Sequence, residues 1–243
     1  MGPGARTFLR QAVHRGGKKS CTRAPCPHKL VDRMSQFARR LSSAPPLSAL
    51  APQIRANWCK FTVRYIKQLS ELERRAVFNA MGDELREHIR AAGPLQWLDA
   101  ETFFDLCSAI RTGLGPNQAR AFWRKSLGEC LEEPFIRPLV KGATFLWGKS
   151  PEAPIRRTPQ AWQLVSKNCG TLSAVDLEEE NCMVLEVRGL PRVARGNQGL
   201  VHLWEGAFRG HMDAFDCDGT VEAQVEHFES RGDLDYVIRW HAL

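Results

Sequence analysis

The sequence predicts an α+β protein in which N-terminal helices pack on a four-stranded antiparallel sheet. Between residues 56 and 169, apolar side chains recur every three or four positions, which is the period of amphipathic helices. After Gly170 the period changes to two, the period of strands, with one further helical segment in between. Residues 170–241 therefore form a predicted β-β-α-β-β unit, which follows the helical part (56–169) in a single domain, residues 56–243.

The first 55 residues differ from this domain in composition. They contain eleven of the 34 Lys and Arg residues but one of the 27 acidic residues, which gives them a net charge of +10 and the remainder −3. They are rich in Gly, Pro, Ser and Arg and have no sustained apolar period, so they bury too little surface to offset the entropy of ordering. We therefore expect residues 1–55 to be a basic disordered leader. A start assigned upstream of the true one at Met34, an organellar transit peptide and a nucleic-acid-binding arm would share this composition.

The helical part begins with two predicted helices. A short helix over 58–69 precedes one whose first turn matches a capping box, in which Ser70 and Glu73 bind each other's backbone amides. The Gly-Pro step at 93–94 ends the second helix. Its predicted buried stripe is Leu72, Ala76, Val77, Ala80, Met81, Leu85 and Ile89.

More helices are predicted before the sheet. Asp99 is expected to cap the first of them, and Pro116 to open the second, because its fixed backbone angle suits a helix start. The apolar residues of these two helices are Phe103, Leu106, Cys107, Ile110, Leu114, Ala119, Phe122, Trp123 and Leu127. The further predicted starts are Pro134, Ser150-Pro151 and Thr158-Pro159. Gly170 is expected to end the last of these helices in a left-handed conformation.

The β-β-α-β-β unit has clear predicted boundaries. Strands over 170–177 and 182–189 are joined by an acidic turn, and Asn197 can cap the helix that follows. On that helix Gly206 and Gly210 allow a close approach, which we expect to be made to the sheet. A third strand alternates from Thr220 onward. The last strand is predicted to place Leu234, Tyr236, Ile238 and Trp240 on one face.

No metal or catalytic pattern is complete in this sequence. Cys21, Cys26 and His28 lack a nearby fourth ligand, which a zinc site normally needs. His202 and His211 lie nine residues apart on one predicted helix and therefore on different sides of it. We expect no metal, no cofactor and no catalytic residue. No apolar run approaches the roughly 18–20 residues that cross a bilayer, and the cysteines are expected to be reduced thiols in a cytoplasm.

Several short stretches carry a family resemblance. They are Trp97-Leu98-Asp99, Ala161-Trp162, Cys169-Gly170, Trp204-Glu205-Gly206 and the ending from Gly232 to Trp240. Together they resemble an uncharacterised paralogous family known chiefly from myxobacteria. More distantly, residues 57–241 are similar to the ligand-binding fold shared by 4-vinyl-reductase-type domains, haem-NO-binding-associated domains and TRAPP vesicle-tethering subunits.

The resemblance implies a small-molecule-binding or protein-interaction module, often dimeric, rather than a catalyst. The wider group often carries a thiol in its last strand, and Asp235 stands at that position here. This departure argues against metal-dependent or thiol-dependent ligand chemistry.

Our first hypothesis is a cytoplasmic, non-enzymatic sensor or adaptor domain that binds an unidentified small apolar ligand or a protein partner. The predicted pocket lies between the last strand and two helices, and its residues are Trp162, Trp204, Leu234, Tyr236 and Ile238. Two other functions stay open: an enzyme with an unrecognised site, and nucleic-acid association through the basic leader. The titratable residues on which the enzyme would depend are His202, His211, Asp213 and Asp235.

Overall fold

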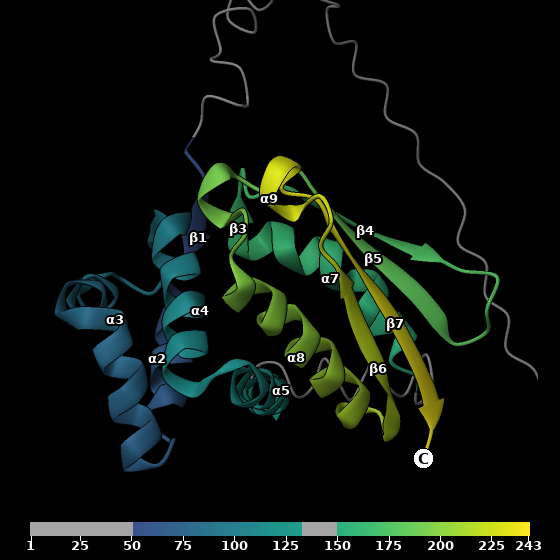
Figure 1. Ribbon diagram of the computed structural model, residues 1–243, viewed down its shortest axis with the longest axis horizontal. Helices are drawn as coiled ribbons and strands as arrows, with labels where there is room; N and C mark the ends of the chain where they lie inside the picture. Colours follow the sequence, from purple (N-terminus) through teal and green to yellow (C-terminus); the bar gives the residue numbers. More distant parts are fainter. Residues whose placement is uncertain (1–50, 133–149) are drawn as a thin grey trace, which may run out of the picture. The chain divides into compact units, whose positions relative to one another are not determined.

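The computed structural model describes residues 51–132 and 150–243, which belong to one unit of the chain (Figure 1). The predicted helix at Pro134 lies outside these residues, as does the predicted leader up to residue 50. The described helices are α2 (Ala56–Ile66), α3 (Glu71–Ala91), α4 (Ala100–Leu114), α5 (Pro116–Glu132), α7 (Glu152–Val165), α8 (Gln198–Ala214) and α9 (Phe228–Arg231), with a 3-10 turn at Arg192–Ala194. Within these residues, no helix is long and apolar enough to cross a membrane.

The strands form two sheets. The strands are β1 (Gln53–Arg55), β2 (Trp97–Asp99), β3 (Ser166–Lys167), β4 (Thr171–Asp176), β5 (Cys182–Arg188), β6 (Cys217–Gln224) and β7 (Leu234–Ala242). The larger sheet has the order β4-β5-β7-β6 and is antiparallel throughout. The predicted α+β class and four-stranded antiparallel sheet are therefore confirmed.

The four-stranded sheet has one buried face. Tyr236 on β7 pairs with Leu185 on β5 and with Ala223 on β6, and the side chains of this row share the inner face. The predicted inner residues of β7 are all buried: Leu234, Tyr236, Ile238 and Trp240. The alternation that predicted this strand is therefore confirmed. Asp235 points to the opposite face, where it forms an ion pair with Arg188.

Helix α8 connects the two halves of the fold. Figure 1 shows α8 between the sheet on one side and helices α4 and α5 on the other. Its start is capped as predicted, since the Asn197 side chain accepts a hydrogen bond from the backbone of Leu200. The same side chain donates to the backbone oxygen of Phe104 on α4, at 2.9 Å. The cap therefore also fixes α8 to the helical layer.

Helix α3 is only partly as predicted. The capping box between Ser70 and Glu73 is present. Gly82 interrupts the helix with φ 70° and ψ 169°, a conformation that a residue without a side chain adopts readily. Leu72 was predicted on the buried stripe but is 81% exposed, because it lies in the first turn, ahead of the buried Val77.

A small sheet that the sequence did not predict joins three distant segments. Its order is β2-β1-β3, and β1 includes residues assigned to the end of the leader. These strands have only two or three residues, too few for a period of two to be visible. Asp99 stands at the start of α4, but its side chain makes no capping hydrogen bond, so that expectation is wrong. The backbone amide of Ala100 donates instead to Pro52, beside β1.

Helix α7 is a single helix where two starts were predicted. It runs from Glu152 to Val165 with Pro159 inside it, so Thr158-Pro159 is not a helix start. Thr158 is buried, and its hydroxyl donates to the backbone oxygen of Pro154, as helical Thr residues often do. The helix also ends earlier than Gly170, because β3 follows it directly.

The glycines of α8 face the helical layer rather than the sheet. A Cβ atom on Gly206 would lie 2.5 Å from the backbone oxygen of Arg120 and 2.7 Å from Cβ of Trp123, both on α5. Gly210 meets α5 in the same way, and Gly199 meets the backbone of Cys107 on α4. The predicted packing of these glycines against the sheet is therefore wrong, and they set the distance between α8 and the helices behind it.

Replacing Gly206 by Ala is expected to lower the free energy of unfolding. The added methyl group clashes with the α5 backbone, and overpacking of this kind costs about 1–3 kcal/mol. Gly128 on α5 has no heavy atom within 4 Å of its added Cβ, so Gly128→Ala is the matched control. Better helix propensity should stabilise that variant by up to about 1 kcal/mol. Urea denaturation measures both, and equal effects of the two substitutions would contradict the close contact.

Candidate functional site

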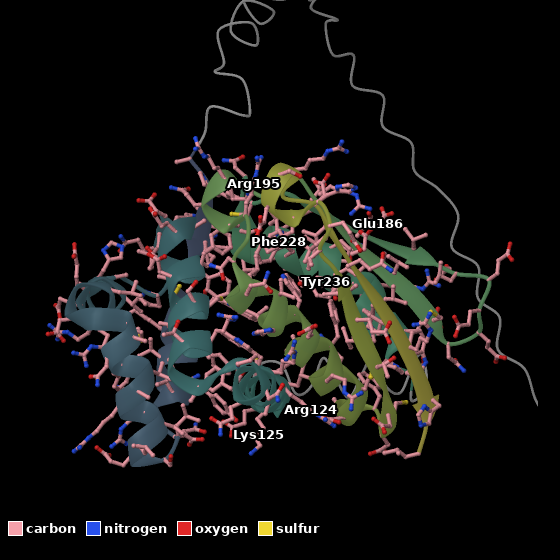
Figure 2. All side chains as sticks on the ribbon, in the orientation of Figure 1. Arg124, Lys125, Glu186, Arg195, Phe228 and Tyr236 are labelled. Carbon is pink, nitrogen blue, oxygen red and sulfur yellow. The ribbon has the colours of Figure 1, made fainter. Side chains whose placement is uncertain are left out.

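The structure brings the aromatic residues of the predicted pocket together. Trp162 on α7 meets Trp204 on α8 edge to face, with ring centroids 5.4 Å apart. Trp204 stacks on Phe208 at 5.6 Å, and Phe208 meets Tyr236 on β7 at 5.8 Å. We call Trp162, Trp204, Phe208 and Tyr236 the aromatic column. Figure 2 places Tyr236 between α8 and the sheet.

Leu234 and Ile238 lie two residues on either side of Tyr236 on the inner face of β7, and both are buried. Phe208 was missing from the sequence prediction, although it lies four residues after Trp204 and therefore on the same side of α8. Its position at the centre of the column makes it the residue that connects the tryptophans to the sheet.

The aromatic column lies where the pocket was expected, and the pocket itself stays a prediction. All four side chains are buried and touch in sequence from α7 to β7. Four hollows at the surface of the described residues lie elsewhere: along α7, between α3 and α4, between α5 and α8, and between α2 and α3. None of these four is lined by a residue of the column. A ligand in the predicted pocket would have to displace these side chains.

One polar atom in the column has no partner among the described residues. The Tyr236 hydroxyl is completely buried and makes no hydrogen bond there. Burial raises the pKa of Tyr236 well above its ordinary value, and the charge of Glu205 adds to this. A buried hydroxyl without a partner costs about 1–3 kcal/mol.

The two histidines of α8 do not form a reactive site. His202 is 5% exposed, and burial lowers its pKa to about 4, helped by the positive charges of Arg120 and Arg111. Burial also lowers the pKa of His211 to about 4. Both side chains are therefore neutral near pH 7, and His211 stacks on Phe208, with ring centroids 6.2 Å apart.

The remaining residues of the enzyme hypothesis are held elsewhere. Asp213 forms a two-pronged ion pair with Arg124 on α5, with both distances 2.5 Å. Asp235 is paired with Arg188 on the outer face of the sheet. Within the described ranges, no group of three or more His, Cys, Asp or Glu side chains could hold a metal ion. The structure therefore does not assemble the four titratable residues into one site.

The buried thiols are also unreactive. Burial raises the pKa of Cys59 to about 12 and that of Cys169 to about 11, so both stay protonated near pH 7. Cys169 donates weak hydrogen bonds to the backbone oxygens of Gln53 and Lys167, which helps to hold β1 beside β3. These cysteines pack as small apolar groups.

Comparison with known proteins identifies the fold. No protein-family model and no curated protein matches the sequence. The unliganded Fe(II) H-NOX protein from K. algicida matches with a TM-score of 0.54 at 6% identity, over 78% of this chain and 98% of that chain. A protein studied for heme redox potential and porphyrin distortion matches at 0.51 and 12%, over 78% and 97%. The F78L variant of Tt H-NOX matches at 0.50 and 13%, over 78% and 97%.

These matches show an H-NOX-like fold, that is, the fold of haem-nitric oxide/oxygen-binding domains, over about 77% of the chain. The predicted resemblance to a ligand-binding fold is thus confirmed in this coarser form, and no sequence family is shown. At identities of 6–13% the likeness concerns the fold alone.

The residues of and beside the aromatic column do not fit the haem that this fold implies. A cofactor of that size needs a pocket on the order of 300–1,000 Å³, whereas the aromatic column occupies the space between α7, α8 and the sheet. The haem axial ligands known in proteins are His, Cys, Met and Tyr. His202 lies beside two arginine cations, His211 is packed on Phe208, and the hydroxyl of Tyr236 is held protonated by burial. None of these three side chains therefore offers an available ligand atom to a haem beside the aromatic column.

Tyr236→Phe is expected to raise the free energy of unfolding. The substitution removes a buried hydroxyl that has no partner among the described residues, which relieves up to about 1–3 kcal/mol. The only other tyrosine of the chain is Tyr65, so Tyr65→Phe is the matched control and should change stability little. Chemical denaturation of the three proteins decides the point. A loss of stability in Tyr236→Phe would show that the hydroxyl is bonded.

The free energy of unfolding is also expected to decrease as the pH is lowered, because of His202. In the unfolded chain this side chain binds a proton near pH 6.5, but in the fold only near pH 4. Between these values the unfolded state binds more protons, so stability is present above pH 6.5 and is lost as the pH falls toward 4. His202→Gln should flatten this loss by at most about 1.4 kcal/mol per pH unit. Urea titrations from pH 7 to 4 measure how the free energy of unfolding changes with pH, with His88→Gln at an exposed position as control. If His202→Gln has the same pH dependence as the unmodified chain, His202 does not cause the loss.

Proposed function

We propose that this chain is a non-enzymatic protein-interaction module, an adaptor that uses an H-NOX-like fold without haem. The observation that carries the proposal is the aromatic column from Trp162 to Tyr236, which occupies the core where a ligand pocket was predicted. Since this core is filled by the chain's own side chains, recognition falls to the surface.

The chemistry of the described residues supports a module without catalysis. The α8 histidines are neutral near pH 7, the buried thiols are protonated, and the carboxylates of Asp213 and Asp235 are neutralised by arginines. A catalytic site normally gathers such groups in one cleft with matched pKa values. Here His202, His211 and Asp213 share α8 but face different surroundings, and Asp235 lies on the outer face of the sheet.

A second candidate function is a small-molecule sensor. One observation favours it, namely the Tyr236 hydroxyl, which is buried in an apolar core with no partner among the described residues. A small apolar ligand with one hydrogen-bonding atom could bind there if Phe208 and Trp204 moved aside. This candidate requires a change of rotamers in the column, whereas the adaptor does not.

Two measurements on the full chain separate these functions. Native mass spectrometry of protein purified from its host should give the mass of the bare chain, and haemin titration should give no saturable Soret band at one equivalent. A stoichiometric adduct that is lost in Tyr236→Phe but kept in Tyr65→Phe would establish the sensor instead. A saturable haem complex would refute the haem-free proposal.

A further inference from the structure

A groove lies at the surface between helices α2 and α3. These two helices lie on the side of the fold away from the four-stranded sheet (Figure 1). The hollow is about 750 Å³ in volume. On α2 and its C-cap the lining residues are Lys60, Val63, Arg64 and Lys67, which follow the i, i+3, i+4, i+7 spacing of one helix face. On α3 the groove is lined mainly by residues after the break at Gly82. Two neighbouring helix faces thus form its walls.

The groove has an apolar floor. Val63 and Phe78 are half-buried and pack against the core, and Ile89 is buried below them. Partly exposed aliphatic and aromatic side chains between two helices are the surface against which a third helix packs when it lays its apolar face in a groove. The floor therefore indicates that the occupant is a helix with one apolar face.

The rim of the groove is basic on a body that is otherwise acidic. Five cations line it against two acids, Asp83 and Glu87, whereas residues 56–243 together carry a net negative charge. The five cations are Lys60, Arg64, Lys67, Arg86 and Arg90. The acids pair with Arg86 and Arg90 in the i, i+3 relation, and exposed pairs of this kind contribute at most about 1 kcal/mol. Carboxylates of a partner can therefore exchange for them readily.

The two lysines of the rim have no carboxylate partner among the described residues. The Lys60 ammonium donates to the backbone oxygen of Arg90 at 2.9 Å, and the Lys67 side chain is exposed. They lie seven residues apart, which is about 10 Å, or two turns of a helix. Acidic side chains spaced two turns apart on a partner helix would reach both.

We propose that the α2–α3 groove binds an acidic amphipathic helix of a partner protein. The partner's apolar stripe lies on Val63 and Phe78, and its carboxylates meet Lys60 and Lys67 at the rim. Nucleic acid fits this groove less well, since its phosphate backbone would leave the apolar floor without a partner. The proposal rests on the adaptor function and names the surface and the partner class for it.

The test uses the full chain and a synthetic helical peptide of 18 residues with leucines at i, i+3, i+4, i+7 spacing and flanking glutamates. Fluorescence anisotropy should show saturable binding that weakens with salt. Lys60→Glu with Lys67→Glu should weaken it by roughly tenfold, because each reversal replaces an attraction with a repulsion. Lys125→Glu on α5 makes the same change of charge as Lys67→Glu alone, but outside the groove, and is the matched control for that single variant (Figure 2).

The outcomes are distinct. A peptide in which lysines replace the glutamates should not bind. If Lys125→Glu weakens binding as much as the rim variant, or if the rim variant binds normally because the peptide is held elsewhere, the groove is not the site. Lys67→Glu alone, at an exposed position, should still weaken binding if the double variant proves poorly folded.

Two further results would overturn the proposal. A DNA duplex that binds in place of the peptide and is lost in the rim variant would assign the groove to nucleic acid. If the chain is free of haem and other ligands but does not bind the peptide, the groove is not the binding site. The adaptor function would still stand in that case.

Discussion

The close approach of α8 to α4 and α5 is the constraint on which the rest of this structure depends. Gly199, Gly206 and Gly210 remove side chains from one side of α8, so that its backbone meets the helices directly. The opposite side of the same helix carries Trp204 and Phe208, which fill the distance to the sheet. Because the small residues set one spacing and the aromatic residues the other, a substitution on either side of α8 shifts both layers.

Much of the fold could be predicted from the sequence, because long segments carry a strong signal. The capping box at Ser70, the cap at Asn197 and the alternation in β7 each depend on neighbouring residues, and each is present. The failures depend on distant contacts. The three short strands of the small sheet are held by pairing between residues as far apart as Gln53 and Lys167, and Pro159 lies inside α7 rather than at a helix start.

The candidate site was only half predictable for a related reason. Sequence spacing shows which residues share a face, so the meeting of Trp162, Trp204 and Tyr236 could be expected. It does not show whether the space between such faces is empty or filled, since that depends on packing among three elements. Here Phe208 lies between Trp204 and Tyr236, and this contact becomes visible only when α8 is placed on the sheet. A shared fold does not show whether this space is filled either, because the same backbone can enclose a cofactor or a core of packed side chains.

The strand order has a consequence for how the protein is made. In the order β4-β5-β7-β6, β7 lies between β5 and β6, although it follows both along the chain. Until Leu234 to Ala242 have been synthesised, β5 lacks its second neighbour and β6 has none. Until then, Phe208 of α8 also lacks Tyr236, against which it packs in the folded protein. During synthesis the nascent sheet therefore exposes unpaired backbone and apolar surface, and this is the stage at which aggregation or capture by a chaperone competes with folding.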